Sequence, residues 1–450
     1  MKVKSSEYLT NTRPLLKKLL NRLLESFSYA SILAVDSEAY QYRVSKTVTF
    51  MGEDDLLCNR GFVIKVYDGN AYGEYSFNDI SEEKIEAFRA KRAHVNYGDF
   101  GENLVVSQYK QLEDEPCTFC ESTDYEIAPE DMGDEAILAK LTEIKDDALL
   151  YDKKILNATV GLSTQKYSKL FLSPNRDMEQ NVMWACGMLM VDAKKDAVVK
   201  YSFKGFSNLG GIEIMRDIRG GIGHVGKNTL ELLEASPIEP GEYDCICTPE
   251  VTGMIAHEAF GHGVEMDMFV KDRALAKSYV GKDVAAPVLT MHDGANMACE
   301  HEVASYFFDD EGVLSKDTVV IKDGVLQTGI SDAQSAMSLG TVPTGNGRRE
   351  SYKRKAYTRM TNTYFEPGKD KLEDMIASIK YGFLLEDASS GMEDPKNWGI
   401  QLMVNIAREI KDGKFTGKVF SPIVMSGYVP DLLKSITMMS DEIKLGGSGF

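Results

Sequence analysis

Hydrophobic and polar positions recur along the first half of the chain with two different periods. Apolar residues at helical spacing predict helices over residues 8–27, 82–94, 135–156 and 227–234. Strict alternation predicts a strand over residues 40–51 and several antiparallel strands over residues 158–201. Residues 61–77 predict a hairpin that turns at Asp68-Gly69-Asn70, because these residue types tolerate the backbone angles of tight turns.

The second half of the chain is mainly β after one helix. A short strand is predicted over residues 243–247, and Thr248-Pro249-Glu250 then provides an N-cap, a proline at the first helical position and an acid near the positive helix end. Further elements are a hairpin over 318–326, a helix over 371–381, and strands over 361–365, 400–410 and 417–425.

These elements predict an α+β protein with large antiparallel β-sheets and flanking helices. The segment 236–241 contains two prolines and a glycine and is the best candidate for a domain boundary. We therefore predict an N-terminal α+β domain over residues 1–235 and a β-rich C-terminal domain over residues 236–450.

The helix that begins after Thr248 carries the chain's most informative residues. His257 and His262 are five residues apart, and Glu258 directly follows the first. Neutral imidazole is a common zinc ligand, and a Glu beside an activated water can act as a general base. In a regular α-helix, however, roughly 100° per residue would point the two rings about 140° apart.

Both rings can therefore meet one metal ion only if the helix is distorted or ends between them. Gly261 and Gly263 flank His262 and permit a π-bulge or an early helix end. We predict that the helix is not a regular α-helix through His262. The alternative, from the residues alone, is an amphipathic helix with two incidental histidines and an end set by glycine.

Four segments of the second half occur in a distinctive order. They are residues 257–263 (HEAFGHG), 305–312 (SYFFDDEG), 343–352 (PTGNGRRESY) and 359–364 (RMTNTY). Together they resemble the TldD branch of the TldD/PmbA family, whose members have also been described as modulators of DNA gyrase. The specific matches fall between about residue 250 and residue 450, and the likeness over the first 240 residues is looser.

This resemblance implies a two-domain PmbA/TldD-like fold and a cytosolic zinc metallopeptidase that hydrolyses peptides or unfolded segments. In the family the two motif histidines bind zinc, here His257 and His262, and the following Glu, here Glu258, acts as the base. The family often works as a pair of related subunits, so a homodimer or a heterodimer with a related subunit is expected. An extended peptide would suit an exposed sheet edge by strand addition, which reads backbone rather than side chains.

The third zinc ligand of the family is a Cys in a Gly-rich C-terminal segment, and no Cys follows Cys299 in this sequence. We therefore expect the chain as written to bind zinc weakly, since two imidazoles are one protein ligand short of a typical catalytic site. If zinc is bound firmly, Cys245, Cys247, Cys299 and Glu265 are the candidates for the third ligand. The same departure supports an alternative function, a non-catalytic peptide-binding or partner-stabilising subunit of the same fold.

Charge and composition narrow the expected partners and location. The net charge is −18, and ten acidic residues without a basic one lie between Glu113 and Glu135. Such a chain lacks the basic footprint of a nucleic-acid-binding protein, so direct nucleic-acid contact is not expected. The sequence shows neither a secretory signal nor an apolar run long enough for a membrane, and its seven cysteines are typical of reduced thiols. These features predict a cytoplasmic protein.

One further pair of residues is a candidate for substrate binding. The guanidinium groups of Arg348 and Arg349 would suit a peptide carboxylate or backbone. The equally weighted alternative is a tight turn in which Arg349 pairs with Glu350 or another acid.

Overall fold

The computed structural model describes residues 1–86, 105–295 and 302–446, and residues 105–106 only by their backbone. The first part of the chain forms a nine-stranded sheet in the order β5-β4-β3-β1-β7-β8-β6, with β2 on β1 and β9 on β8. Its strands are β1 Tyr29–Val44, β2 Thr49–Glu53, β3 Asn59–Tyr67, β4 Tyr72–Phe77, β5 Val105–Ser107, β6 Cys117–Ser122, β7 Ile155–Leu172, β8 Arg176–Lys195 and β9 Val198–Leu209.

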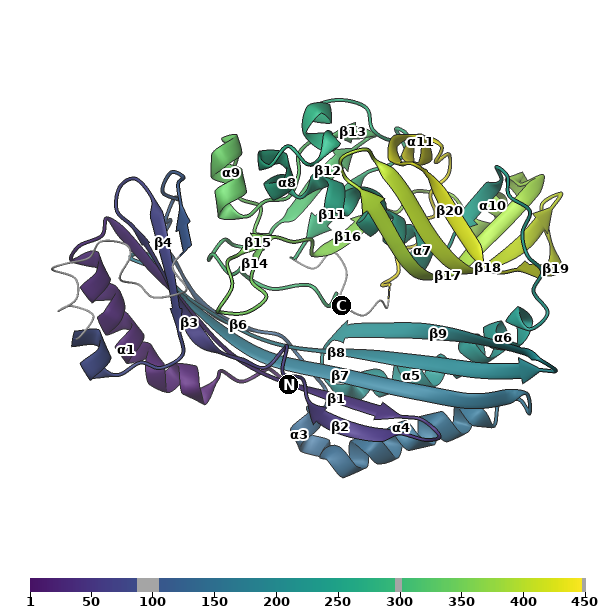
Figure 1. Ribbon diagram of the computed structural model, residues 1–450, viewed down its shortest axis with the longest axis horizontal. Helices are drawn as coiled ribbons and strands as arrows, with labels where there is room; N and C mark the ends of the chain where they lie inside the picture. The colour runs from purple at the N-terminus through teal and green to yellow at the C-terminus, as the bar shows by residue number, and fades with distance from the viewer. Residues whose placement is uncertain (87–104, 296–301, 447–450) are drawn as a thin grey trace.

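Helices pack on one face of this sheet (Figure 1). The N-terminal helix packs its leucines on β1, β3 and β7, and a second core lies between the sheet and the helices after β6 and β9. These helices are α1 Glu7–Leu24, α3 Pro129–Met132, α4 Asp134–Leu149, α5 Met215–Gly220 and α6 Ile222–Leu232.

Sequence patterns located most of these elements but misjudged several ends. The hairpin around Asp68 is confirmed by β3 and β4, whereas the single strand predicted over 40–51 is wrong. It is a second hairpin, in which β1 turns at residues 45–48 and pairs back with β2. The error arises because the alternation continues through a turn that has neither Gly nor Pro. The predicted helix over 82–94 is helical at residues 82–86, and residues 87–94 lie outside the described residues.

The remainder of the chain forms smaller sheets that face the nine-stranded sheet (Figure 1). A five-stranded sheet has the order β10-β17-β18-β19 with β20 on β18, a four-stranded sheet has the order β13-β12-β11-β16, and β14 pairs with β15. Their bounds are β10 Asp244–Cys247, β11 Met291–Gly294, β12 Asp317–Lys322, β13 Val325–Leu326, β14 Gly347–Arg348, β15 Tyr357–Thr358, β16 Asn362–Phe365, β17 Tyr381–Asp394, β18 Gly399–Lys411, β19 Lys414–Phe420 and β20 Ile423–Tyr428.

One apolar core joins the five- and four-stranded sheets, and the histidine-bearing helix lies within it. The other helices of this part are α8 Met266–Val270, α9 Ala333–Leu339, α10 Leu372–Ser378 and α11 Val429–Lys434, with a 3-10 turn at Leu275–Tyr279. The strand predicted over 417–425 is in fact the end of β19 and the start of β20, which are separated by Ser421-Pro422.

The α+β class with large antiparallel sheets is confirmed. The domain limits at residues 235 and 236 stay a prediction, and Ser236 itself is tied to β19 through backbone hydrogen bonds with Val419 and Ser421. Across the described ranges, no helix combines the length and hydrophobicity that crossing a membrane requires.

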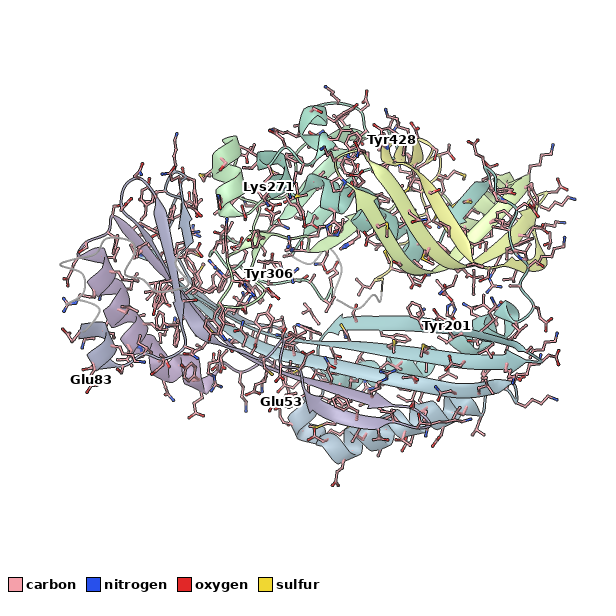
Figure 2. The ribbon with its side chains drawn as sticks, viewed as in Figure 1. Glu53, Glu83, Tyr201, Lys271, Tyr306 and Tyr428 are labelled. Atoms are coloured by element: carbon pink, nitrogen blue, oxygen red, sulfur yellow. The ribbon has the colours of Figure 1, made fainter. Side chains whose placement is uncertain are left out.

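Two ion pairs join loops of the C-terminal part to strands of the N-terminal sheet. Lys65 on β3 pairs with Glu311 at 2.6 Å, and Glu74 on β4 pairs with Arg349 at 2.8 Å. All four side chains are buried. We call this set, Lys65, Glu74, Glu311 and Arg349, the junction. Figure 2 places Tyr306, from the segment 305–312, in the same region above the nine-stranded sheet.

Candidate metal centre and groove

The helix after β10 changes its geometry at the histidines. It starts as an α-helix, α7 Pro249–Met254, continues as a π-helix over Ile255–Gly261, and ends in a 3-10 turn over His262–Val264. Pro249 occupies the first turn as predicted, although the Thr248 side chain makes no capping hydrogen bond. The prediction that this helix is not regular through His262 is therefore confirmed.

The π-helix places the two imidazoles together. In this geometry the hydrogen bonds run between residues five apart, so residues at i and i+5 share a face. The ring centroids of His257 and His262 lie 5.0 Å apart. Gly261 is needed between them, because a Cβ atom there would lie 2.1 Å from the Met360 sulfur. The sequence spacing that looked wrong for an α-helix is the right spacing for this one.

Three potential ligand atoms converge at this point. His257, Glu258 and His262 each offer one atom, and these atoms all lie within 4.8 Å of one another. Within the ranges that the structure describes, this is the only such group of three His, Cys, Asp or Glu side chains. The histidine side chains are 44% and 43% exposed, so a ligand can reach them, whereas Glu258 is only 16% exposed.

The surroundings of the two rings differ. Burial, together with the neighbouring His262, lowers the pKa of His257 and so favours its neutral form. The Glu265 carboxylate, with its Oε1 3.6 Å from Nδ1 of His262, raises the pKa of that ring. Glu265 is itself buried, with the guanidinium of Arg359 3.8 Å away. A carboxylate behind a histidine is the usual arrangement that orients a metal-binding imidazole.

Glu258 is held from the opposite side by β17. A Cβ atom on Gly391 would lie 2.4 Å from Cγ of Glu258, so the strand approaches this side chain closely because it carries glycine there. Two residues further on, Glu393 lies beside Gly263, and its carboxyl oxygens are buried without a hydrogen-bond partner. Burial raises the pKa of Glu393 to about 9, so this side chain is a neutral acid at neutral pH.

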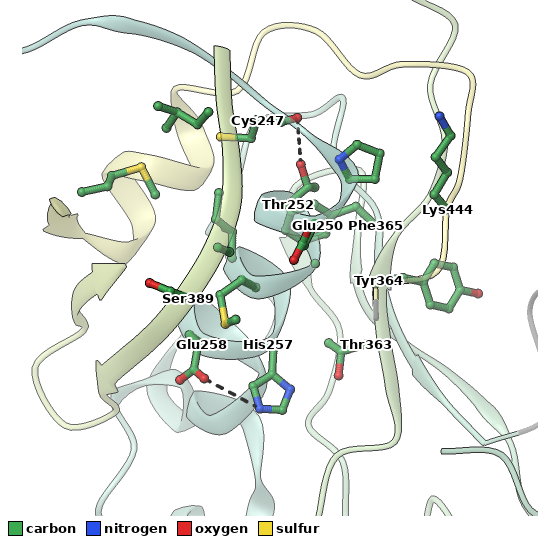
Figure 3. Close-up of a pocket in the computed structure, with 18 of the residues that line it drawn as sticks. Cys247, Glu250, Thr252, His257, Glu258, Thr363, Tyr364, Phe365, Ser389 and Lys444 are labelled. Carbon is green, nitrogen blue, oxygen red and sulfur yellow. Dashed lines mark hydrogen bonds and ion pairs between the residues drawn. The ribbon is translucent and has the colours of Figure 1, made fainter. Parts of the chain in front are cut away.

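Two of the converging residues, His257 and Glu258, line a groove of about 2160 Å³ between the two parts of the molecule. One wall is formed by β1, β2 and β7–β9, and the other by the segment before β10, by α7, by β16 and by β20. Figure 3 shows this wall, with Glu250 and His257 on the same helix and Thr363 on the neighbouring strand. The chain segment Glu442–Gly446 also contributes to the lining.

Sequence reasoning missed the residue that anchors this strand. Asp293 on β11 is fully buried and accepts hydrogen bonds from the Thr361 and Thr363 hydroxyls and from the Asn346 amide. Two threonines at alternate positions of a strand were the available signal. Asp293 therefore fixes β16 beside the histidines, and its charge in turn acts on His257.

Arg348 and Arg349, which were expected to bind substrate, lie away from the groove. The side chain of Arg349 is buried in the junction, where it pairs with Glu74. This is the alternative considered above, pairing with an acid, and the acid is Glu74 and not Glu350. Arg348 donates to the carbonyl of Met360 at 3.0 Å. Neither side chain lines the groove in the described residues.

Among the described residues, the candidates Cys245, Cys247 and Glu265 do not join the converging set. Cys245 and Cys247 line the groove, but burial raises the pKa of their thiols to about 11 and about 12. Cys299 and residues 447–450 lie outside the described residues.

The sequence of this chain is similar to that of known proteins. Residues 240–450 match the PmbA/TldA metallopeptidase C-terminal domain. A metalloprotease of Methanocaldococcus jannaschii is 26% identical over 439 residues, which cover 95% of this chain and 92% of that protein. A zinc metalloprotease TldD homolog of Saccharolobus solfataricus is 30% identical over 264 residues, or 58% of each chain.

The same fold occurs in a solved structure. TldE from Thermococcus kodakarensis superimposes with a TM-score of 0.76, covering 95% of this chain and 94% of that one, at 20% sequence identity. At this identity the likeness establishes the fold alone. The domain match and the relatives show that this chain is similar to proteins named as metalloproteases. Residues 240–450 are similar to the PmbA/TldA metallopeptidase C-terminal domain, and the resemblance to the TldD/PmbA family is confirmed.

Proposed function

We propose that this protein is a TldD-like zinc metallopeptidase that hydrolyses peptides or unfolded segments. The observation that carries the proposal is the convergence of His257, Glu258 and His262, the first two of which line a groove large enough for an extended peptide. The two imidazoles suit zinc, which binds imidazole nitrogen. The relatives named as metalloproteases support the same class.

In this proposal the two histidines hold the ion as neutral ligands, and Glu265 keeps the His262 ring in position. A bound zinc ion supplies a Lewis acid and lowers the pKa of water towards about 7. Glu258 accepts the proton of the attacking water, because it directly follows one ligand and its oxygen lies 3.9 Å from Nε2 of His257. Glu393, as a neutral acid behind the helix end, adds no charge that would repel an ionised Glu258.

The substrate backbone is proposed to add to β16. Within the described residues this strand pairs only with β11 and is the last strand of its sheet. The N–H of Glu366 donates to the carbonyl of Thr290, on the β11 side of β16. In an antiparallel pair every second residue bonds to the same neighbour, so the backbone groups of Tyr364 also face β11. The backbone groups of Thr363 and Phe365 then face away from β11, beside the helix that carries His257. Pairing through these groups would select an extended peptide backbone.

A paired assembly is also part of the proposal. The chain resembles a TldD homolog in sequence and TldE in fold, and two related chains of this kind would suit a heterodimer as well as a homodimer.

The test is Glu258→Gln in zinc-loaded protein. The amide keeps the size of the side chain but cannot accept a proton, so peptide hydrolysis should fall at least about 100-fold. Zinc content should stay nearly unchanged, because the two imidazoles remain. Hydrolysis that survives in the variant would place the base elsewhere.

The alternative function, a non-catalytic peptide-binding subunit, makes a different prediction. Such a protein would bind the same peptides as tightly when zinc is removed by a chelator, and zinc-loaded protein would not cleave them. Measuring peptide binding and cleavage on one preparation therefore separates the two functions.

A further inference from the structure

The two walls of the groove differ in charge. We call the wall formed by β1, β2 and β7–β9 the N-terminal wall and the opposite one the C-terminal wall. Among the described lining residues, the C-terminal wall contributes nine carboxylates and one lysine, whereas the N-terminal wall contributes one arginine and no acid. The N-terminal wall presents instead the apolar side chains of Val48, Phe50, Met188 and Phe203. The excess of acids is larger than the composition of the chain requires, since the whole sequence has 69 acidic and 51 basic residues.

Several of these acids have no ion-pair partner within 4.0 Å. Glu242 and Asp244 are exposed and make no ion pair within the described residues, and neither does the half-buried Glu250. Burial and the neighbouring Asp387 raise the pKa of Glu250 to about 7, against the opposing charges of Lys204 and His224. Keeping a carboxylate partly buried without a partner costs free energy, which a cation from outside would offset.

Glu250 stands at a defined place relative to the histidines. Seven residues separate it from His257, along a helix that is α up to Met254 and π from Ile255. Both side chains line the groove (Figure 3). The rise of the helix separates them by about 10 Å along its axis, a distance that an extended peptide covers in about three residues.

Resting on the proposed function, we propose that the groove selects peptides in which a lysine or arginine lies about three residues from the scissile bond. Glu250 holds the cation, and Glu242 and Asp244 extend the attraction toward the mouth of the groove. The apolar N-terminal wall contacts neighbouring apolar side chains of the same peptide. This makes Glu250 a specificity-determining residue rather than part of the hydrolytic machinery.

Binding of labelled octapeptides to the full chain tests this proposal without depending on hydrolysis. The peptides consist of alanine and valine with one central Lys, Gln or Glu, and binding is followed by fluorescence anisotropy in the presence of a chelator. We expect the Lys peptide to bind about tenfold more tightly than the Gln peptide, and the Glu peptide to bind most weakly. The preference should shrink as salt is raised, because exposed charges are screened.

Variants then locate the preference. Glu250→Gln should remove most of it while leaving the affinity for the Gln peptide unchanged, and Glu242→Gln with Asp244→Asn should reduce it further. Glu121→Gln, an exposed acid on β6 outside the groove, is the matched control and should change nothing. Unchanged thermal unfolding of each variant excludes misfolding as the cause.

Two results would overturn the inference. Equal binding of the Lys, Gln and Glu peptides would refute the charge selection while leaving the proposed peptide groove intact. A Lys preference that survives all three groove substitutions would refute the role of these carboxylates. Failure of every peptide to bind would count against the proposed function as well as the selection. Moving the Lys along the octapeptide, with cleavage mapped in zinc-loaded protein, tests the predicted spacing of about three residues.

Discussion

Two regions between the N- and C-terminal parts of this molecule, the junction and the groove, use charge differently. At the junction, Lys65, Glu74, Glu311 and Arg349 are buried and each has an opposite charge within 4.0 Å. In the groove, Glu242, Asp244 and Glu250 line an open space and have no such partner in the described residues. Both sets lie between the same two parts of the chain.

The difference distinguishes charged side chains that stabilise the fold from charged side chains that are available to bind a ligand. A buried charge that loses its partner is very costly, so the junction residues are bound to one another and cannot serve an outside molecule. Exposed carboxylates cost the fold little and stay available. The motif residues 305–312 and 343–352 supply much of the junction, so they hold the two walls of the groove at a fixed separation rather than contacting substrate.

The largest effect is expected at the junction. Glu74→Gln removes the ion-pair partner of Arg349, which stays buried, and should lower the free energy of unfolding by about 3 kcal/mol. Urea unfolding measures this value. A loss below about 0.5 kcal/mol, the level typical of an exposed ion pair, would show that the junction is not the buried ion-pair network described above.

The junction should also weaken in acid. Burial alone would raise the pKa of Glu74, but the charges of Arg349 and Lys65 outweigh it and lower the pKa to about 2 from the ordinary 4.5. A lowered pKa contributes stability that is present above the unfolded value of 4.5 and is lost as the pH falls toward about 2. The stability difference between wild type and Glu74→Gln should therefore shrink between pH 5 and pH 2 in urea unfolding experiments. A constant difference over this range would contradict the pairing.

A smaller effect is expected where β17 meets the candidate base. In Gly391→Ala the added Cβ would lie 2.4 Å from Cγ of Glu258 and 2.7 Å from Leu402, so we expect about 1–3 kcal/mol of destabilisation. Displacement of Glu258 should also lower hydrolysis in zinc-loaded protein. Gly427→Ala on β20 is the control, because no atom lies within 4 Å of its added Cβ. Equal behaviour of the two variants would show that Gly391 does not position Glu258.

The smallest effect on stability is expected for the groove acids. Glu242→Gln should change the free energy of unfolding by less than about 0.5 kcal/mol, since the side chain is exposed and unpaired. The same variant should weaken binding of a Lys-containing peptide. A clear loss of stability here would erase the contrast between junction and groove.

Local spacing and patterning predicted the fold class and the core of the site. The interval of five residues between His257 and His262, with glycine beside the second, already required the distortion that the π-helix provides. The hairpin around Asp68 followed from turn chemistry in the same way. These features depend on neighbours in sequence, which a single chain displays directly.

Long-range partners were not predictable in this way. Arg349 meets Glu74, 275 residues earlier, and its residue type alone suits a substrate carboxylate equally well. Glu393 reaches the end of the histidine helix from a strand whose sequence shows nothing unusual at that position. The turn that divides β1 from β2 lacks Gly and Pro, and the alternation of polar and apolar residues continues through it, so the sequence did not indicate the turn.

The central claim is that the π-helix brings His257 and His262 to one metal ion, and zinc titration of single-histidine variants tests it most directly. Loss of residues that merely support metal ligands costs about 10–100-fold in affinity, so loss of a ligand should cost more. We therefore predict that His257→Ala and His262→Ala each lower zinc affinity by more than about 100-fold, whereas His224→Ala, whose ring pairs with Asp387 elsewhere, leaves it unchanged. Unchanged affinity in either of the first two variants would show that the two rings do not share an ion.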